Sequence, residues 1–64
     1  MKLSDARKGT YSIKNVTCRR LVELGFVPGR TVEVQINRSR RLIVVIKGEK
    51  FAIDRRIAGG VEVD

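Results

Sequence analysis

The sequence has no histidine, no tryptophan and a single cysteine, Cys18. Catalytic triads and Cys–His dyads need a general base, which is usually histidine, so this chain matches neither class. A structural zinc site needs four Cys or His ligands, and a disulfide within the chain needs a second cysteine. We therefore expect a fold that is held together by its hydrophobic core, as suits a reducing cytosol.

Long apolar runs are also missing. The longest spans residues 42–46, whereas a membrane-spanning helix needs about 20 apolar residues. The start of the chain carries charged side chains and no apolar run, so no signal peptide is indicated. The 64 residues are expected to form a single domain, 1–64, which is too small to enclose a deep substrate cavity. We expect a cytoplasmic protein that is not an enzyme.

What the sequence has in excess is positive charge. Fourteen Lys and Arg residues stand against seven Asp and Glu residues, which gives a net charge of +7. An excess of this size indicates an anionic partner, and the candidates are nucleic acid, an acidic protein surface and an anionic membrane surface. Charge does not choose among the three, and a basic face is also compatible with simple solvation.

Alternating apolar residues and turn-forming residues predict a mainly β protein. Residues 1–9 are interpreted as a lead-in and turn, and residues 54–57 as an irregular or 3₁₀ turn. Within the second strand, Val32, Val34 and Ile36 are expected to face the core. Five short antiparallel strands are predicted, at residues 10–14, 31–36, 42–46, 51–53 and 61–63. Such strands are most stable in a sheet that curls until its edges nearly close, so the predicted fold is a small SH3-like barrel with one short α-helix.

The one predicted helix covers residues 18–24. Thr17 precedes it and is a residue type that favours the N-cap position. Cys18, Leu21 and Val22 follow at the i, i+3, i+4 spacing of an apolar helix face. A helix of about two turns is not stable alone, so this face is expected to dock on the sheet.

The end of this helix is specified by a sharp corner. Gly25 stands where a left-handed residue closes a helix, and Phe26 is then placed to pack back on Leu21. Pro28 and Gly29 suit the two central positions of a type II turn. Because cap and turn chemistry account for these residues, we interpret them, with Leu24, as a helix stop and core corner rather than a docking face.

The residues around this corner resemble a known family. The block 19–29 contains Glu23-Leu24-Gly25 and then Pro28-Gly29, and the alternating Val32-Glu33-Val34 follows. This order is similar to that of the FeoA family, ferrous iron transport protein A, and weaker matches extend the resemblance over nearly the whole chain. The resemblance implies an SH3-like barrel that assists FeoB, the membrane ferrous-iron permease with a cytosolic G domain.

Five arginine residues are the candidates for contacting a partner. Two lie on the polar side of the predicted helix and three lie in the basic turn at 37–41, which is shorter than the loop of many family members. The planar guanidinium group pairs two carboxylate or phosphate oxygens at once, which suits an acidic surface. The predicted partner-binding residues are Arg19, Arg20, Arg38, Arg40 and Arg41.

No catalytic, cofactor-binding or metal-binding residue is predicted. Cys18 is interpreted as a small apolar residue of the helix face rather than a reactive thiol or metal ligand. The acidic pairs Asp54 with Glu49 and Asp5 with Asp64 offer oxygen ligands, but Fe(II) prefers sites that also contain imidazole. The resemblance links the chain to the transport of a transition metal ion, and we expect the permease to handle the iron.

Two functions are compared. The first is a cytosolic accessory protein that binds the FeoB-type permease, modulates its assembly or activity, and is at most peripheral to the membrane. The alternative is a small basic barrel that binds nucleic acid. Proteins that bind single strands expose aromatic side chains for base stacking, and at least two of Tyr11, Phe26 and Phe51 are interpreted as core. The open edge of a barrel also allows pairing into a homo-oligomer.

Overall fold

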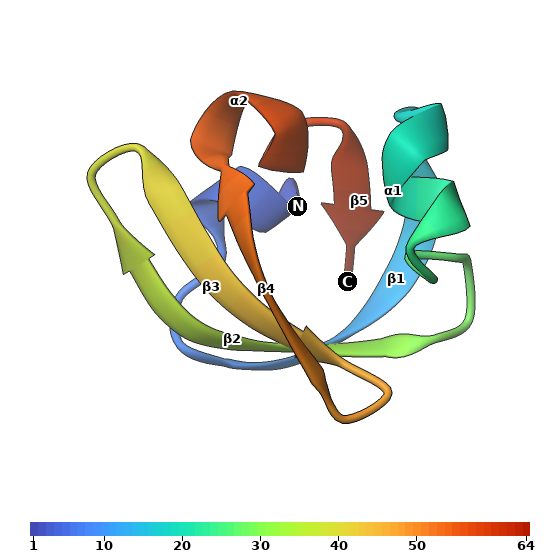
Figure 1. The fold of residues 1–64 in the computed structure, drawn as a ribbon, viewed down its shortest axis with the longest axis horizontal. Coiled ribbons are helices and arrows are strands. Elements are labelled where there is room, and N and C mark those ends of the chain that lie inside the picture. The colour runs from blue at the N-terminus through green and yellow to red at the C-terminus, as the bar shows by residue number, and fades with distance from the viewer.

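The computed structural model describes all of residues 1–64 and contains one five-stranded antiparallel sheet with the strand order β4-β3-β2-β1-β5. The elements are a 3₁₀ helix η1 (Leu3–Asp5), β1 (Gly9–Val16), α1 (Arg19–Glu23), β2 (Thr31–Arg38), β3 (Arg41–Ile46), β4 (Glu49–Asp54), α2 (Arg55–Ala58) and β5 (Val61–Val63). Figure 1 shows that the sheet bends into a U, with α2 across its open side. This arrangement confirms the predicted mainly β, curled fold. No helix has the length and apolar character needed to cross a membrane.

Two irregularities in strand pairing accompany this bend. The register shifts between Ile13 and Asn15 where β1 pairs with β5, and between Val34 and Ile36 where β2 pairs with β3. An extra residue in one strand of an antiparallel pair bends that strand and increases its twist. β1 consequently serves both halves of the sheet: its first part pairs with β2 and its second part with β5.

The shift in β2 overturns one expectation. Val32 and Val34 are fully buried, as predicted, but Ile36 is 45% exposed rather than facing the core. The prediction was wrong because side chains alternate strictly only in a regular strand, and the irregularity at Gln35 reverses the alternation. Asn37, which was assigned to a turn, lies in the strand and is half-buried.

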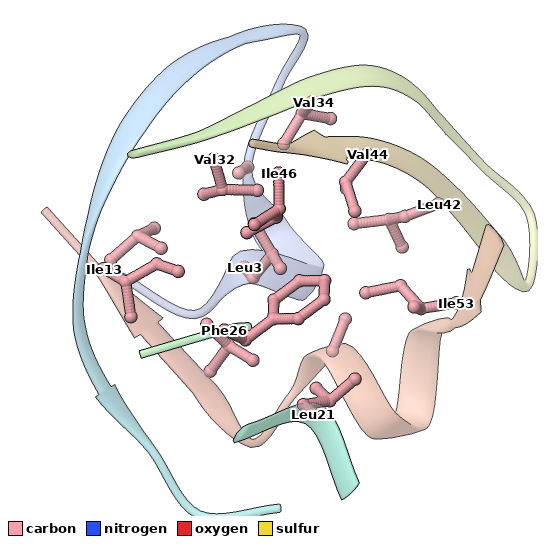
Figure 2. Close-up of a cluster of buried hydrophobic side chains, with 14 residues drawn as sticks. Leu3, Ile13, Leu21, Phe26, Val32, Val34, Leu42, Val44, Ile46 and Ile53 are labelled. Carbon is pink, nitrogen blue, oxygen red and sulfur yellow. The ribbon is translucent and has the colours of Figure 1, made fainter. Parts of the chain in front are cut away.

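The core fills the inside of the U and draws on almost every element. Figure 2 shows the ring of Phe26 in the middle of this cluster, close to Leu3 and Leu21. Phe26 is fully buried, and its ring centroid lies 5.8 Å from that of Phe51. Leu3 and Ala6 are also fully buried, so the segment interpreted as a lead-in is a 3₁₀ helix that seals the core. The buried apolar residues are Leu3, Ala6, Ile13, Leu21, Phe26, Val32, Val34, Leu42, Val44, Ile46, Ile53, Ala58, Val61 and Val63.

A second helix stands where only one was predicted. Residues 54–57 were expected to form an irregular or 3₁₀ turn, but α2 is a short α-helix. Its N-cap is Asp54, whose Oδ1 accepts a hydrogen bond from the backbone N–H of Arg56 at 2.7 Å. The buried Ala58 then anchors the helix on the core. Gly59 and Gly60 end it, and β5 follows as predicted.

Candidate partner-binding surface

An apolar groove lies between α1 and the junction of β4 with α2. Its volume is about 230 Å³. This apolar groove is lined by Cys18, Arg20, Leu21, Leu24, Ala52, Ile53, Asp54 and Ile57. Leu24 and Ile57 keep 43% and 42% of their surface exposed. The groove therefore presents apolar surface that a bound molecule would remove from water.

The corner after α1 fixes one wall of this groove. The backbone N–H of Phe26 donates to the Leu21 carbonyl at 2.9 Å, and that of Gly25 donates to the Val22 carbonyl at 3.0 Å. These two bonds form the predicted Schellman motif, and Gly25 has the positive φ of +107° that the motif requires. The Arg30 guanidinium closes the corner by donating to the Gly25 carbonyl at 3.0 Å.

The turn at Pro28 and Gly29 ties the corner to the sheet. The Arg30 N–H donates to the Val27 carbonyl at 3.1 Å, as predicted for a β-turn centred on these two residues. The Gly29 N–H also donates to the Ile13 carbonyl, at 2.8 Å. The corner residues Leu21 and Phe26 are buried, as interpreted, whereas Leu24 is not a core residue but an exposed wall of the groove.

The start of α1 differs from the prediction. The N-cap is Cys18 and not Thr17, and its side chain makes no capping hydrogen bond. Thr17 instead reaches across to β5: its N–H and its Oγ1 donate to the Gly60 carbonyl at 2.9 and 3.2 Å. A Cβ on Gly60 would stand 2.8 Å from Thr17 Oγ1, so a side chain at this position would force Thr17 or the backbone to shift. The Thr17 hydroxyl, which was predicted to cap α1, therefore makes a tertiary hydrogen bond to Gly60 instead.

A second depression, the arginine cleft, lies on the other side of Asp54. It is an open cleft of about 450 Å³ lined by Arg40, Asp54, Arg55 and Arg56. Arg40 comes from the turn between β2 and β3, and the other three residues come from the end of β4 and from α2. Because Asp54 borders both depressions, the apolar groove and the arginine cleft adjoin one another.

Arg55 holds the cleft together. Its Nε donates to the Ser39 carbonyl at 2.6 Å, its Nη1 donates to the Ser4 carbonyl at 2.6 Å, and its Nη2 donates to Oδ1 of Asn37. The Asn37 amide in turn donates to the Ser4 and Ala6 carbonyls at 3.1 and 2.8 Å. One guanidinium group thus joins α2, η1 and the β2–β3 turn. Sequence reasoning missed it, because its partners lie 16, 18 and 51 residues away along the chain.

The structure does not gather the five predicted partner-binding residues into one surface. Arg38, Arg40 and Arg41 lie at the β2–β3 turn, and Arg19 and Arg20 lie in α1. Figure 1 shows the turn and α1 on opposite sides of the molecule, with α2 between them. Arg20 lines the apolar groove and Arg40 lines the arginine cleft. A role for these residues in binding stays a prediction.

Very little of the positive charge is neutralised within the chain. The only ion pair joins the Met1 ammonium to Glu62 Oε2 at 2.6 Å. This hydrogen bond, with smaller contributions from the charges of Lys14 and Lys2, holds the pKa of Glu62 below its ordinary value of 4.5. No Lys or Arg side chain has a carboxylate partner within ion-pair distance. The basic surface is therefore left to interact with anions from outside the chain.

The acidic residues do not converge. No group of three or more His, Cys, Asp or Glu residues is placed to bind a metal ion. Asp54 and Glu49 lie at opposite ends of β4, and Asp64 accepts a hydrogen bond from the Ser12 N–H at 2.9 Å. Cys18 is half-buried in the wall of the apolar groove.

Comparison with known proteins adds a consistent result. The family model of the FeoA domain matches residues 1–64. No protein with a curated description matches the sequence significantly. Three solved structures resemble the chain over nearly all of its length, and each is described as a FeoA protein.

The first is an iron uptake regulatory protein (FeoA) with a TM-score of 0.90 and 28% identity, where the match covers 98% of this chain and 93% of the other. The second is FeoA from Chlorobium tepidum, with a TM-score of 0.82, 26% identity, and coverage of 98% and 68%. The third is FeoA of Stenotrophomonas maltophilia complexed with zinc, described as an SH3 domain protein, with a TM-score of 0.85, 30% identity, and coverage of 100% and 89%. The predicted SH3-like fold is confirmed by this likeness.

Proposed function

Because this chain belongs to the FeoA family, which is associated with ferrous iron transport, we propose that it is a cytosolic accessory protein that binds an FeoB-type ferrous-iron permease and modulates its assembly or activity. The family consists of small accessory transport proteins and is not a known enzyme family. We therefore propose that the chain acts by binding the permease and not by catalysing a reaction.

The apolar groove is the observation that carries this proposal. A chain of this size exposes single apolar side chains routinely, but Leu24 and Ile57 stand on the walls of one depression. Burial of apolar surface stabilises association at roughly 25 cal/mol per Å². The two side chains thus supply a centre for an interface, with the neighbouring polar residues as its rim.

The charge around the groove defines the partner's chemistry. Arg20 stands in the groove wall, and the arginine cleft adjoins the groove at Asp54. A complementary segment carries one or two apolar side chains for the groove and acidic residues beside them for the arginines. We assign this segment to the cytosolic part of the permease; of the five predicted partner-binding residues, Arg20 lines the groove and Arg40 lines the adjoining cleft.

Co-purification with the detergent-solubilised permease tests the proposal. Ile57→Ser removes an apolar side chain from the groove, and Ile36→Ser makes the same change at an equally exposed position on β2. We expect Ile57→Ser to weaken retention of the permease about tenfold, because burial of an aliphatic side chain is worth roughly 1.5–3 kcal/mol, and Ile36→Ser to leave it unchanged.

Charge reversal provides a second arm of the same assay. Changing Arg38, Arg40 and Arg41 together to Glu is expected to reduce binding further at low salt than at high salt, because exposed charges are screened. Permease binding that survives both Ile57→Ser and this triple change would contradict the assigned surface. Absence of any binding by the unmodified chain, with and without guanine nucleotide, would contradict the function itself.

The nucleic-acid alternative is less well supported. It rests on the net charge of +7. Phe26 is buried, Phe51 packs against it, and the Tyr11 hydroxyl donates to the Arg7 carbonyl at 2.7 Å. None of the three aromatic residues is left exposed as a stacking platform for bases. Micromolar binding of a labelled oligonucleotide in fluorescence anisotropy, with a steep dependence on salt, would favour this alternative over the accessory role.

A further inference from the structure

We propose that the arginine cleft, next to the apolar groove, is itself a binding site for a phosphate group, a ligand different in class from the acidic permease residues that the proposed function places beside the same arginines. Three arginines, Arg40, Arg55 and Arg56, line one open cleft, and the only acidic residue among its walls is Asp54. A cluster of three cations, none of which has an ion pair within the chain, is a surface suited to an anion with several oxygens.

The framework of the cleft is rigid. Three hydrogen bonds from Arg55 to Ser4, Asn37 and Ser39 hold its guanidinium group in one orientation. The Arg55 N–H also donates to the Arg40 carbonyl at 2.7 Å, which ties the β2–β3 turn to α2. All the acceptors of Arg55 are neutral, so its positive charge is oriented but not compensated.

The two remaining guanidinium groups are free. Neither the Arg40 side chain nor the Arg56 side chain has a hydrogen bond or an ion pair within the protein. Their backbones are nevertheless fixed, because the Arg40 carbonyl accepts from Arg55 and the Arg56 N–H donates to Asp54. The cleft thus combines one oriented cation with two cations that can close on a ligand.

The charge of the cleft matches a phosphate better than a single carboxylate. Three arginines against Asp54 leave an excess of two positive charges, and a phosphate monoester carries about −1.5 to −2 at pH 7. A phosphate monoester also presents three oxygens that can accept from the unbonded guanidinium groups of Arg40 and Arg56 beside the positive charge of Arg55, whereas a carboxylate has two. Because the cleft is open, it admits a phosphate that is carried by a small ester or by a lipid headgroup.

NMR titration of the ¹⁵N-labelled chain with inorganic phosphate, at constant ionic strength, tests the site. We expect saturable shifts of the side-chain Nε–H signals of Arg40, Arg55 and Arg56. The double variant Arg40→Gln and Arg56→Gln should weaken binding by about tenfold or more, since hydrogen bonds between charged groups are the strong ones. The control pair Lys14→Gln and Lys50→Gln removes the same charge from exposed positions on β1 and β4 and should leave binding nearly unchanged.

Asp54→Asn tests whether the negative charge of Asp54 opposes phosphate binding. Asparagine also serves as an N-cap, so α2 is retained, but the negative charge in the cleft is lost. Phosphate binding should then tighten by on the order of threefold. Weaker binding by a folded Asp54→Asn variant would overturn the proposal.

Sedimentation with phosphatidylcholine vesicles, with and without phosphatidylglycerol, separates the two sources of phosphate. Binding to inorganic phosphate that depends on Arg40 and Arg56 supports a site for a small phosphate ester. Binding only to the anionic vesicles, with the same dependence, supports a lipid headgroup site. The proposal is overturned if neither probe binds, or if the control pair weakens binding as much as the cleft variant does.

Discussion

Two corners of this small barrel are held by different means. The corner after α1 depends on backbone hydrogen bonds between near neighbours, with Leu21, Gly25 and Phe26 forming the Schellman motif. The corner around α2 depends on one side chain, Arg55, which donates to residues far apart in the sequence. The first corner positions the apolar groove and the second positions the arginine cleft.

This difference between the two corners predicts which substitutions will disturb each of them. Local backbone bonds are insensitive to most side-chain substitutions, apart from the glycine and the buried phenylalanine that the motif requires. The hydrogen bonds made by one guanidinium group are all lost with that residue; Asn37 Oδ1 then has no donor in the protein, and the Ser4 carbonyl keeps only the Asn37 amide. We therefore expect the groove to tolerate sequence change at its exposed residues and the cleft to depend on Arg55.

The largest effect is expected at the buried side of the α1 corner. Phe26→Ala removes the ring at the centre of the core and should lower the free energy of unfolding by roughly 3–5 kcal/mol. Chemical denaturation followed by circular dichroism measures this loss. A change below about 1 kcal/mol would mean that Phe26 is not the packing centre that the structure describes.

Breaking the α2 corner should come next. Arg55→Met keeps the length of the side chain but removes the donors to Ser4, Asn37 and Ser39, and we expect it to cost about 2–4 kcal/mol. Arg56→Met is the matched control, because its side chain makes no hydrogen bond, and it should change stability by less than about 0.5 kcal/mol. Equal effects of the two substitutions in urea denaturation would remove the distinction between the corners.

Backbone strain in the α1 corner should have a smaller effect. Gly25→Ala places a side chain at φ +107° and a Cβ 3.2 Å from Arg30 Nη1, so a loss of about 1–2 kcal/mol is expected. Glu23→Ala on the same helix is exposed and should be nearly neutral. Thermal unfolding of both variants measures the difference, and a stable Gly25→Ala variant would show that the left-handed cap is dispensable.

The smallest effect is expected away from both corners, at Glu62. Its pKa is lowered by the hydrogen bond from the Met1 ammonium. A lowered pKa in the folded state stabilises the protein above the unfolded value of about 4.5, and this contribution disappears as the pH falls through the folded value. The stability difference between the unmodified chain and Glu62→Gln should therefore be small at pH 7 and shrink below pH 4.5. A difference that grows on acidification would contradict this assignment.

The parts of the fold that could be predicted are those encoded by adjacent residues. Gly25 and Phe26 specify the helix end, and Pro28 with Gly29 specifies the turn, because each motif closes within a few positions. Strand alternation located β1 to β5 for the same reason. The family motif lies in this same stretch, so the residues that carry the resemblance also build one wall of the groove.

The parts that could not be predicted depend on contacts between distant segments. The reversal at Ile36 follows from pairing with β3, and the hydroxyl of Thr17 is taken by Gly60 instead of α1. Arg55 was not singled out because nothing near it in the sequence indicates Ser4 or Asn37 as partners. The exposed place of Leu24 was likewise missed, since its spacing on the helix is equally compatible with the core.

Methyl NMR of the chain bound to the intact permease in a lipid nanodisc is the most direct test of the proposed function. The methyl groups of Leu24 and Ile57 line the apolar groove, whereas Ile36 is equally exposed on β2. We predict that the Leu24 and Ile57 signals shift or broaden on addition of the permease while the Ile36 signal stays in place. Unchanged Leu24 and Ile57 signals in a sample that contains the complex, or a shift confined to Ile36, would contradict the account.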